Sequence, residues 1–391
     1  MTRAEAAALA AGNPLSFLHI SRSDIDLPPE TDPHDPTVYA KARENFTRLL
    51  TDGALLQEAA PSFYVYELTR DGHAQLGVVG CVHVDDYAGN VIRKHENTRK
   101  DKEDDRTRHV LTLNAHAEPV LLTHEGQPFI AQMNHKVVAG SPLYDLTTPD
   151  KVRHRVWRVS DQGGYTDAFR RVAVAYVADG HHRCASACRA GKELRAANPG
   201  HTGGEEYNWF LAVLFPANQL QILPYNRVVR DLNGMRPADF LAALGRVGTV
   251  QPAAEGAPDR PASFGVFLGG RWYRLSLDPA SLRPADAVAA LDVSLLQERV
   301  LGPLLGIGDV RTDSRIEFVG GGTGTEELER RVGSGEMAVA FALHPVTMRQ
   351  LMIIADAGGI MPPKSTWFEP KLLSGLFVHM LKSSESGDAE R

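Results

Sequence analysis

Apolar and polar positions repeat with two different periods, which predicts a mixture of helices and strands from the first hundred residues onward. Residues 39–56 place apolar side chains at helical spacing. Residues 61–69 and 74–84 instead have the character of strands, on either side of the turn RDGH at 70–73. The chain is therefore expected to combine both element types in one fold.

A second strand-to-helix transition lies further along, where the apolar run VAVAYV at 172–177 precedes a helical pattern that should end near Asn198. The two apolar runs at 206–215 and 219–226 predict an antiparallel hairpin around the turn PAN. The remaining expected elements are strands at 119–124, 151–160, 264–269, 271–277, 315–321 and 336–346, and helices at 294–305 and 347–358. This order of elements predicts an α+β fold with mixed sheets.

Length and composition indicate a globular protein that can bury a large core. The 391 residues are 43% hydrophobic and 23% charged, which suits two domains, expected at 1–200 and 201–382, followed by a disordered tail at 383–391. A net charge of -6 disfavours nucleic acid or anionic lipid as the main partner. No apolar stretch approaches membrane-spanning length, and three cysteines do not form a disulfide framework, so a cytoplasmic location is expected.

The densest chemical signal is ADGHHR at 178–183, directly after the apolar strand. Gly180 allows a sharp turn, so His181, His182 and Arg183 should occupy the first turn of a helix. The N-terminus of a helix attracts anions, and a guanidinium group can grip a phosphate with two hydrogen bonds. Asp179 would repel that phosphate unless a divalent cation lies between them, which favours a magnesium-bound nucleotide. The alternative is that Asp179 only caps the helix.

A second cluster, residues 91–109, contains seven Lys or Arg and five Asp or Glu. A solvated helix face is the ordinary explanation of such a run. Here Asp101 would face Asp105, and Lys102 would face Arg106, so like charges would destabilise an isolated helix. His95 and Glu96 follow a strand-like segment, where a carboxylate can act as a base or as a metal ligand.

A third segment, residues 360–381, places Lys364 and Lys371 between prolines and ahead of an expected apolar helix. Two lysines there could hold an anionic group. A structural loop that docks the last helix explains the segment equally well.

These motifs together resemble the family called domain of unknown function 1015. The resemblance extends nearly end to end, through NPLSFLH at 13–19, HENTRKDKEDDR at 95–106, ADGHHR, HTGGEEYNWFLAVLFP at 201–216 and MPPKSTWFEPK at 361–371. Members of that family carry further residues ahead of NPLSFLH, including a Pro-Tyr-Asp segment. If that segment helps to build the site, this chain is expected to be incomplete or differently completed there.

More distantly, ADGHHR after a buried strand resembles the nucleotide-binding box of the ParB and sulfiredoxin superfamily. That resemblance implies a ParB/sulfiredoxin-like core in the first half and an additional α+β region in the second. Free-serine kinases are the most similar locally, because they share the Asp-Gly-His-His-Arg run and use an upstream glutamate as base. Carried over to this chain, the resemblance implies that Asp179 holds Mg²⁺ and that His181, His182 and Arg183 bind the transferred phosphate. The upstream glutamate has no unambiguous counterpart here. Glu96 is chosen as the base because it follows a strand and belongs to the densest polar motif, with Glu118 as the fallback.

The leading hypothesis is a kinase that transfers a phosphate from ATP or ADP to a small hydroxyl acceptor such as L-serine. The candidate catalytic residues are Glu96, Asp179 and His181, and the candidate cofactor-binding residues are Gly180, His182, Arg183, His95, Arg99, Lys100, Lys364 and Lys371. One alternative is a nucleotide-binding switch or adaptor without catalysis, and another is a metal-dependent phosphoesterase with His95, Glu96, Asp179 and His181 as ligands. A sulfiredoxin-like thiol at Cys184 is a minor alternative.

Overall fold

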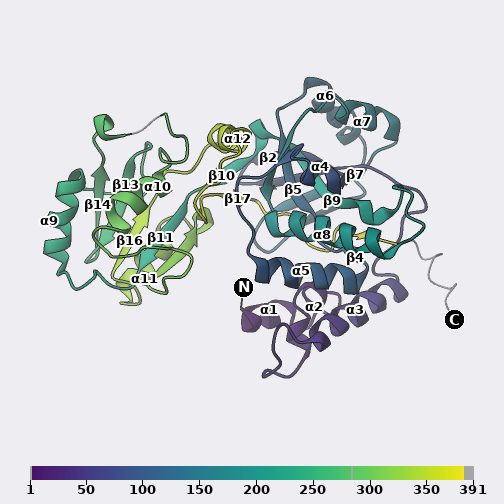
Figure 1. The fold of residues 1–391 in the computed structure, drawn as a ribbon, viewed down its shortest axis with the longest axis horizontal. Coiled ribbons are helices and arrows are strands. Elements are labelled where there is room, and N and C mark those ends of the chain that lie inside the picture. Colours follow the sequence, from purple (N-terminus) through teal and green to yellow (C-terminus); the bar gives the residue numbers. More distant parts are fainter. Residues whose placement is uncertain (1, 283–284, 383–391) are drawn as a thin grey trace. The chain divides into compact units, whose positions relative to one another are not determined.

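The computed structural model describes residues 2–282 and 285–382, so the tail expected to be disordered lies outside the described residues. The chain divides into two compact units (Figure 1). Unit 1 comprises Met1–Gln219 and Pro370–Arg391, and unit 2 comprises Leu220–Glu369. Both units combine helices with sheets, which confirms the predicted α+β class. Among the described residues, no helix has the length and apolar character needed to cross a membrane.

Unit 1 contains an eight-stranded sheet with the order β3-β8-β5-β9-β2-β1-β7-β6. Its strands are β1 (Tyr64–Arg70), β2 (His73–His83), β3 (Ile92–Arg93), β5 (Val120–His124), β6 (Tyr144–Thr147), β7 (Arg153–Arg158), β8 (Ala175–Asp179) and β9 (Trp209–Pro216). Two pairs of neighbours, β3 with β8 and β5 with β9, are parallel, and the other pairs are antiparallel. Because β9 pairs with both β2 and β5, the expected domain boundary at residue 200 is not where the compact units divide.

The predicted turn RDGH joins β1 to β2. Arg70 pairs with His73 in an antiparallel register, and Asp71 and Gly72 both adopt positive φ angles, 50° and 80°. Such a two-residue turn matches the twist of the flanking strands.

Helices α8, α5 and α3 form successive layers below the sheet, whereas α6 and α7 lie above it (Figure 1). Helix α8 packs on β5 and β9, α5 packs on α8, and α3 packs on α5. The helices are α1 (Arg3–Ala10), α2 (Leu18–Ser21), α3 (Pro36–Thr51), α4 (Val84–Ala88), α5 (Lys100–Leu113), α6 (Pro128–Val138), α7 (Gln162–Phe169) and α8 (His181–Ala197). Helix α8 ends at Ala197, next to the stop that the sequence predicts.

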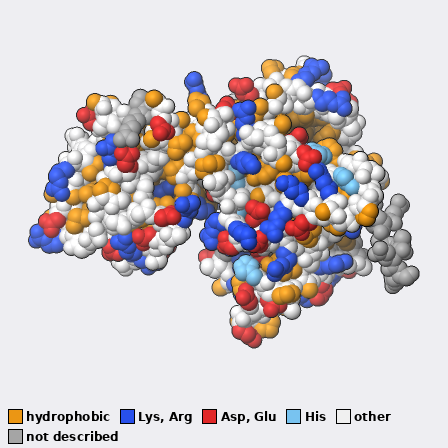
Figure 2. All heavy atoms as spheres, viewed as in Figure 1, with side chains coloured by type: hydrophobic (Ala, Val, Ile, Leu, Met, Phe, Trp, Pro, Cys, Tyr) orange, Lys and Arg blue, Asp and Glu red, His pale blue; other side chains and the backbone are white. Residues whose placement is uncertain are grey.

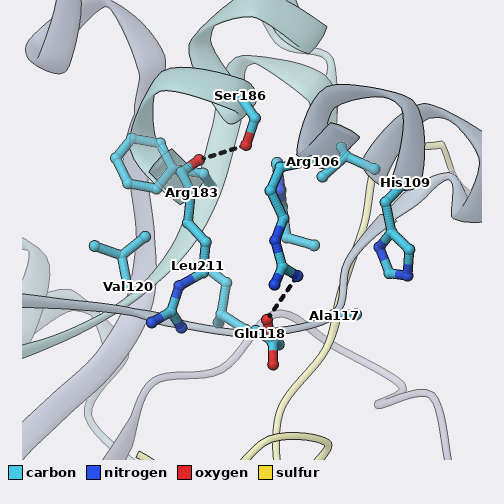
Figure 3. A pocket seen from close by; sticks show the side chains of 11 residues that line it. Arg106, His109, Ala117, Glu118, Val120, Arg183, Ser186 and Leu211 are labelled. Atoms are coloured by element: carbon cyan, nitrogen blue, oxygen red, sulfur yellow. Dashed lines mark hydrogen bonds and ion pairs between the residues drawn. The ribbon is translucent and has the colours of Figure 1, made fainter. Parts of the chain in front are cut away.

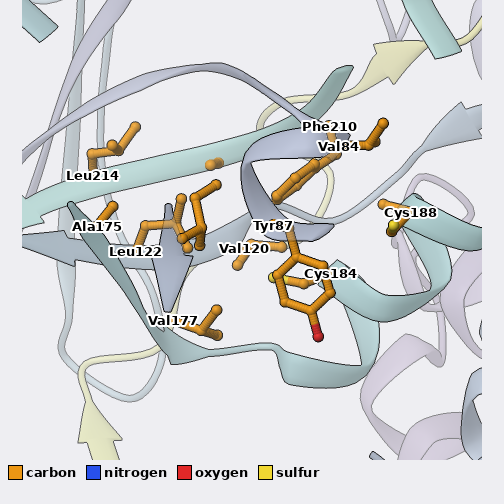
Figure 4. Close-up of a cluster of buried hydrophobic side chains, with 13 residues drawn as sticks. Val84, Tyr87, Val120, Leu122, Ala175, Val177, Cys184, Cys188, Phe210 and Leu214 are labelled. Atoms are coloured by element: carbon orange, nitrogen blue, oxygen red, sulfur yellow. The ribbon is translucent and has the colours of Figure 1, made fainter. Parts of the chain in front are cut away.

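A buried apolar cluster holds α4 and α8 against strands β3, β5, β8 and β9 (Figure 4). Leu122 and Val177 in the middle of this cluster are fully buried. Cys184 and Cys188 project into it from one face of α8, as their spacing of four residues predicts. This packing fixes the position of β8, which carries Asp179, and of α8, which follows it.

Residues 370–381 of unit 1 form a non-helical segment that we call the C-terminal strap. The prediction of an apolar helix in this segment is wrong. Strand β18 (His379–Met380) pairs with β4 (Ala115–His116) instead. Gly375 has a φ of +78°, and a β-carbon there would lie 2.4 Å from the Phe17 ring, so this position requires glycine and interrupts a helix.

Unit 2 contains a six-stranded sheet with the order β12-β14-β13-β16-β11-β15 and a two-stranded sheet of β10 and β17. The elements are β10 (Gln221–Leu223), β11 (Tyr225–Val229), α9 (Pro237–Val247), β12 (Thr249–Pro252), β13 (Ser263–Leu268), β14 (Arg271–Ser276), α10 (Asp292–Leu296), β15 (Ile316–Gly320), α11 (Glu326–Gly333), β16 (Val339–Ala342), α12 (Met348–Asp356) and β17 (Trp367–Glu369). The prediction of a hairpin around PAN is wrong, because β10 pairs with β17 and not with β9. Strand β9 is buried on both faces and belongs in the middle of the unit 1 sheet.

Replacement of Leu122 by Ala should destabilise unit 1, because it leaves a cavity in the cluster that supports α8. We expect a loss of about 2–5 kcal/mol in the free energy of opening, measured by native-state hydrogen exchange of the β8 amides. Leu56→Ala is the matched control, because Leu56 is 82% exposed. Equal protection of these amides in both variants would contradict the assignment of Leu122 to the core.

Candidate functional site

The turn between β8 and α8 is built around Gly180. Its φ and ψ of 100° and 33° place it in the left-handed region, and it is the N-cap of α8 without a side-chain capping bond. Asp179 is thus the last residue of β8 and does not cap the helix, so the simple capping explanation is wrong. The first turn of α8 lacks intrahelical acceptors for its N–H groups and carries the positive end of the helix dipole, so it favours an anion.

Two cations flank the carboxylate of Asp179. Arg183 Nη2 donates to Asp179 Oδ2 at 3.1 Å, and Lys371 Nζ of the strap lies 3.8 Å from Oδ1. The other arm of the Arg183 guanidinium donates to the carbonyl oxygen of Pro119. The Asp179 side chain is 38% exposed and the Lys371 side chain 42%, so both groups can be reached from solvent.

The HENTR motif meets the DGHHR motif in space. Strand β3 pairs in parallel with β8, so the segments that follow the two strands leave from the same edge of the sheet. The rings of His95 and His181 meet edge to face with centroids 4.4 Å apart. The backbone N–H of Arg99 donates to Nε2 of His182 at 3.1 Å, which requires a neutral tautomer protonated at Nδ1.

The His95–His181 pair is buried and neutral near pH 7. Burial lowers the pKa of His95 to about 4, although the Asp179 carboxylate acts in the opposite direction. Burial, together with the neighbouring His95, His182 and Lys94, lowers the pKa of His181 well below its usual value. Among the residues that the structure describes, neither ring nitrogen of His95 nor Nε2 of His181 has a partner with hydrogen-bond geometry. Such orphaned polar groups are costly in a buried position and are typical of functional sites.

Three other predicted residues, Glu96, Arg99 and Lys100, lie just before or at the start of α5. Glu96 follows His95 in the segment that contacts α8, and its side chain is half-buried. The Arg99 side chain pairs with Asp101, and the Lys100 side chain is 90% exposed and lies 3.7 Å from Asp104. Because α5 begins at Lys100, Glu96 lies outside this helix.

Lys364 belongs to unit 2. Its backbone has a φ of 57°, and its ammonium lies 5.6 Å from the centre of the Tyr225 ring. Binding of a cofactor by Lys364 stays a prediction.

The like-charged side chains of the second cluster, residues 91–109, pair with different neighbours. Asp105 accepts a hydrogen bond of 2.6 Å from the Tyr39 hydroxyl of α3, and Arg106 pairs with Glu118. Acidic and basic side chains are interspersed over α5 and α8 on the face shown in Figure 2. This pairing explains how a helix with unfavourable internal spacing is stabilised by its surroundings.

Behind Arg183 lies a small cavity of about 30 Å³ (Figure 3). Arg106, Glu118, Arg183 and Ser186 contribute polar groups to its wall. Glu118 Oε2 lies 3.3 Å from Arg106 Nη1, and the hydroxyl of Ser374 donates to Glu118 Oε1 at 2.9 Å. Sequence reasoning missed Ser374 altogether, and it noted Arg106 only as part of the charged motif.

Cys184 is an unsuitable nucleophile, although it directly follows Arg183. Its thiol is fully buried in the apolar cluster below the turn (Figure 4), and burial raises its pKa far above the usual value. The sulfiredoxin-like alternative needs an accessible thiolate, and this position does not provide one.

Comparison with known proteins places the chain among proteins of unknown function. A family model described as "Protein of unknown function (DUF1015)" matches residues 1–294, and the MPPKST segment lies beyond that match. No curated protein matches the chain.

Several solved structures match weakly. A free serine kinase variant in complex with AMP shares 12% identity at a TM-score of 0.38, over 74% of this chain and 86% of that one. SbnI with a C-terminal truncation, from Staphylococcus aureus, shares 14% identity at a TM-score of 0.40, over 77% and 87% of the two chains. A conserved hypothetical protein from Pyrococcus furiosus shares 13% identity at 0.37, over 76% and 92%. Similarities this low leave the chemistry to be argued from the chain's own residues.

Replacement of Gly180 by Ala should weaken phosphate binding, because a β-carbon would lie 3.0 Å from Nε of Arg183 and would displace its guanidinium. We expect about a tenfold weaker affinity for pyrophosphate, measured by calorimetry. Gly203→Ala is the control, since Gly203 has a similar φ of +94° but open space around its β position. If both substitutions changed the affinity equally, backbone strain alone would explain the effect.

Proposed function

The chain belongs to the DUF1015 family of proteins of unknown function, and we propose that its site transfers a nucleotide phosphate to the hydroxyl group of a small molecule. L-serine is the first acceptor to test. The observation that carries the proposal is the position of Asp179, held between Arg183 and Lys371 at the N-terminus of α8. Phosphoryl transfer depends mainly on positioning and on neutralisation of charge, and this arrangement supplies groups for both.

The phosphate binds at the first turn of α8. Helix N–H groups, the Arg183 guanidinium and the Lys371 ammonium converge there, so the oxygens of the transferred group meet donors on several sides. The buried His95–His181 pair supports this turn from below with two neutral rings. Neutral rings add no further positive charge beneath the turn, so they maintain its shape without holding the phosphate too tightly.

The donor set suits a weakly held Mg²⁺ that arrives with the nucleotide. Magnesium commonly takes one or two carboxylates together with substrate phosphates and waters. Asp179 Oδ1 is 3.8 Å from Lys371 Nζ, beyond hydrogen-bond distance, and is therefore available as a ligand. When bound, the ion would neutralise charge between this carboxylate and the phosphates.

Glu96 is the proposed base that accepts the proton of the acceptor hydroxyl. It follows His95, whose ring packs against His181 in the first turn of α8. A carboxylate placed beside the transferred group can orient a hydroxyl in line with that group. Arg99, the residue that closes the same motif, donates its backbone N–H to His182 and anchors the loop at its other end.

A kinase is better supported than a metal-dependent phosphoesterase. In the described parts of the chain, no group of three or more His, Cys, Asp or Glu side chains is placed to hold a metal ion. The ligand set of His95, Glu96, Asp179 and His181 that a phosphoesterase would need is therefore not assembled, since the two histidine rings contact each other in a buried position.

Turnover should depend on the acceptor and on Glu96. With Mg²⁺, ATP or ADP and L-serine or another small hydroxyl compound, we expect the wild-type protein to consume nucleotide only when an acceptor is present. Glu96→Gln should lower kcat by roughly 10²- to 10⁴-fold with little change in nucleotide affinity, since it removes only the base. Asp179→Asn should lower turnover and raise the Mg²⁺ concentration that half-maximal turnover requires, because it removes the carboxylate ligand.

Glu193→Gln is the control for this assay. Glu193 lies on α8, more than two helical turns after Arg183, and pairs with Arg189. Undiminished turnover in Glu96→Gln would show that the base is another residue. Nucleotide binding without turnover, for every acceptor, would instead support a nucleotide-binding switch. Lack of any nucleotide binding would contradict the phosphate site itself.

A further inference from the structure

We propose that Glu118 is a positioning residue of the phosphate site, which fixes Arg183 by holding the backbone that binds it. This inference rests on the proposed function, because it assumes that Arg183 grips a phosphate. Arg183 donates to the carbonyl oxygen of Pro119, the residue next to Glu118. The orientation of the guanidinium above Gly180 thus depends on where the 118–119 backbone lies.

Two tethers hold Glu118 in place. Arg106 of α5 binds its Oε2 at 3.3 Å, and Ser374 of the C-terminal strap donates to its Oε1 at 2.9 Å. Figure 3 shows the side chains of Arg106 and Arg183 extending from their helices toward the segment that carries Glu118. Because the two tethers come from elements far apart in sequence, they fix the carboxylate from two directions.

The charge of Glu118 is also needed in this place. Arg106 and Arg183 line the same cavity of about 30 Å³, where two guanidinium groups would repel each other without an anion between them. Burial would raise the pKa of Glu118, but the charges of Arg106 and Arg183 and the Ser374 hydrogen bond outweigh it and lower that pKa. Glu118 is therefore ionised near neutral pH.

These contacts make Glu118 a poor candidate for the general base. A general base works best when its pKa is near the working pH, and a carboxylate with a lowered pKa and two occupied oxygens is poorly suited to take a proton. Glu118, the fallback for the base in the sequence analysis, is better explained as a group that acts through Arg183.

The strap provides partners for two acids, Asp179 and Glu118. Lys371 lies beside Asp179, and Ser374, three residues later, binds Glu118. The backbone N–H of Leu373, between them, donates to the Tyr66 hydroxyl at 3.4 Å. Residues 371–374 thus bind both acids and a core tyrosine, and the strap becomes part of the phosphate site.

Glu118→Gln tests the inference, because a charge effect and a positioning effect would change the affinity for pyrophosphate in opposite directions. The amide keeps the shape of the side chain and an acceptor for Ser374 but removes one negative charge. Charge alone would then make an anion bind more tightly. Positioning predicts the opposite, a loss of about tenfold to a hundredfold in pyrophosphate affinity, because Arg183 loses its fixed support.

The experiment compares pyrophosphate binding by calorimetry in wild type, Glu118→Gln, Ser374→Ala and Glu67→Gln. Glu67 pairs with Arg155 within unit 1, so Glu67→Gln removes a paired carboxylate away from the cavity and should leave affinity unchanged. Ser374→Ala should weaken binding in the same direction as Glu118→Gln but less, and it tests the inference even if Glu118→Gln does not fold.

Turnover adds a second readout. Glu118→Gln should raise the KM for nucleotide more than it lowers kcat, whereas Glu96→Gln should lower kcat with little change in nucleotide affinity. Equal or tighter pyrophosphate binding in Glu118→Gln and Ser374→Ala, with normal binding in wild type, would overturn the inference alone. Failure of wild type to bind pyrophosphate would overturn the proposed function and the inference with it.

Discussion

Parallel pairing of β3 with β8 is the constraint on which the site depends. It sends two polar segments away from the same edge of the sheet, so His95 meets His181 and the Arg99 backbone meets His182. The apolar cluster below holds β8 and α8 at a fixed angle, and Gly180 accepts the backbone conformation that this angle requires. The core thus determines where the proposed phosphate-binding turn lies.

The charged groups around that turn are arranged in pairs. Two acids, Asp179 and Glu118, lie beside three cationic side chains, Arg183, Arg106 and Lys371. Each of these two acids orients a cation near the N-terminus of α8. Cations held next to the free N–H groups of a helix favour an anion with several negative oxygens.

Local pattern predicted much of this arrangement. The strand, glycine turn and helix around Gly180 follow from an apolar run that stops at ADGHHR, and the hairpin at RDGH follows from its turn residues. Contacts between distant segments could not be predicted in the same way. Ser374 lies in a segment whose apolar pattern favours a helix, but the strap is not helical, because Gly375 packs on Phe17 and β18 pairs with β4. The role of Glu118 also depends on partners far away in sequence.

The most direct test of the account is a crystal structure of the wild-type protein with Mg²⁺ and a non-hydrolysable ATP analogue. We predict that the terminal phosphate binds at the first turn of α8 within hydrogen-bond distance of the Arg183 guanidinium, with the ion beside Asp179. A nucleotide bound elsewhere, with Arg183 and Lys371 still beside Asp179 and no phosphate at the turn, would contradict it.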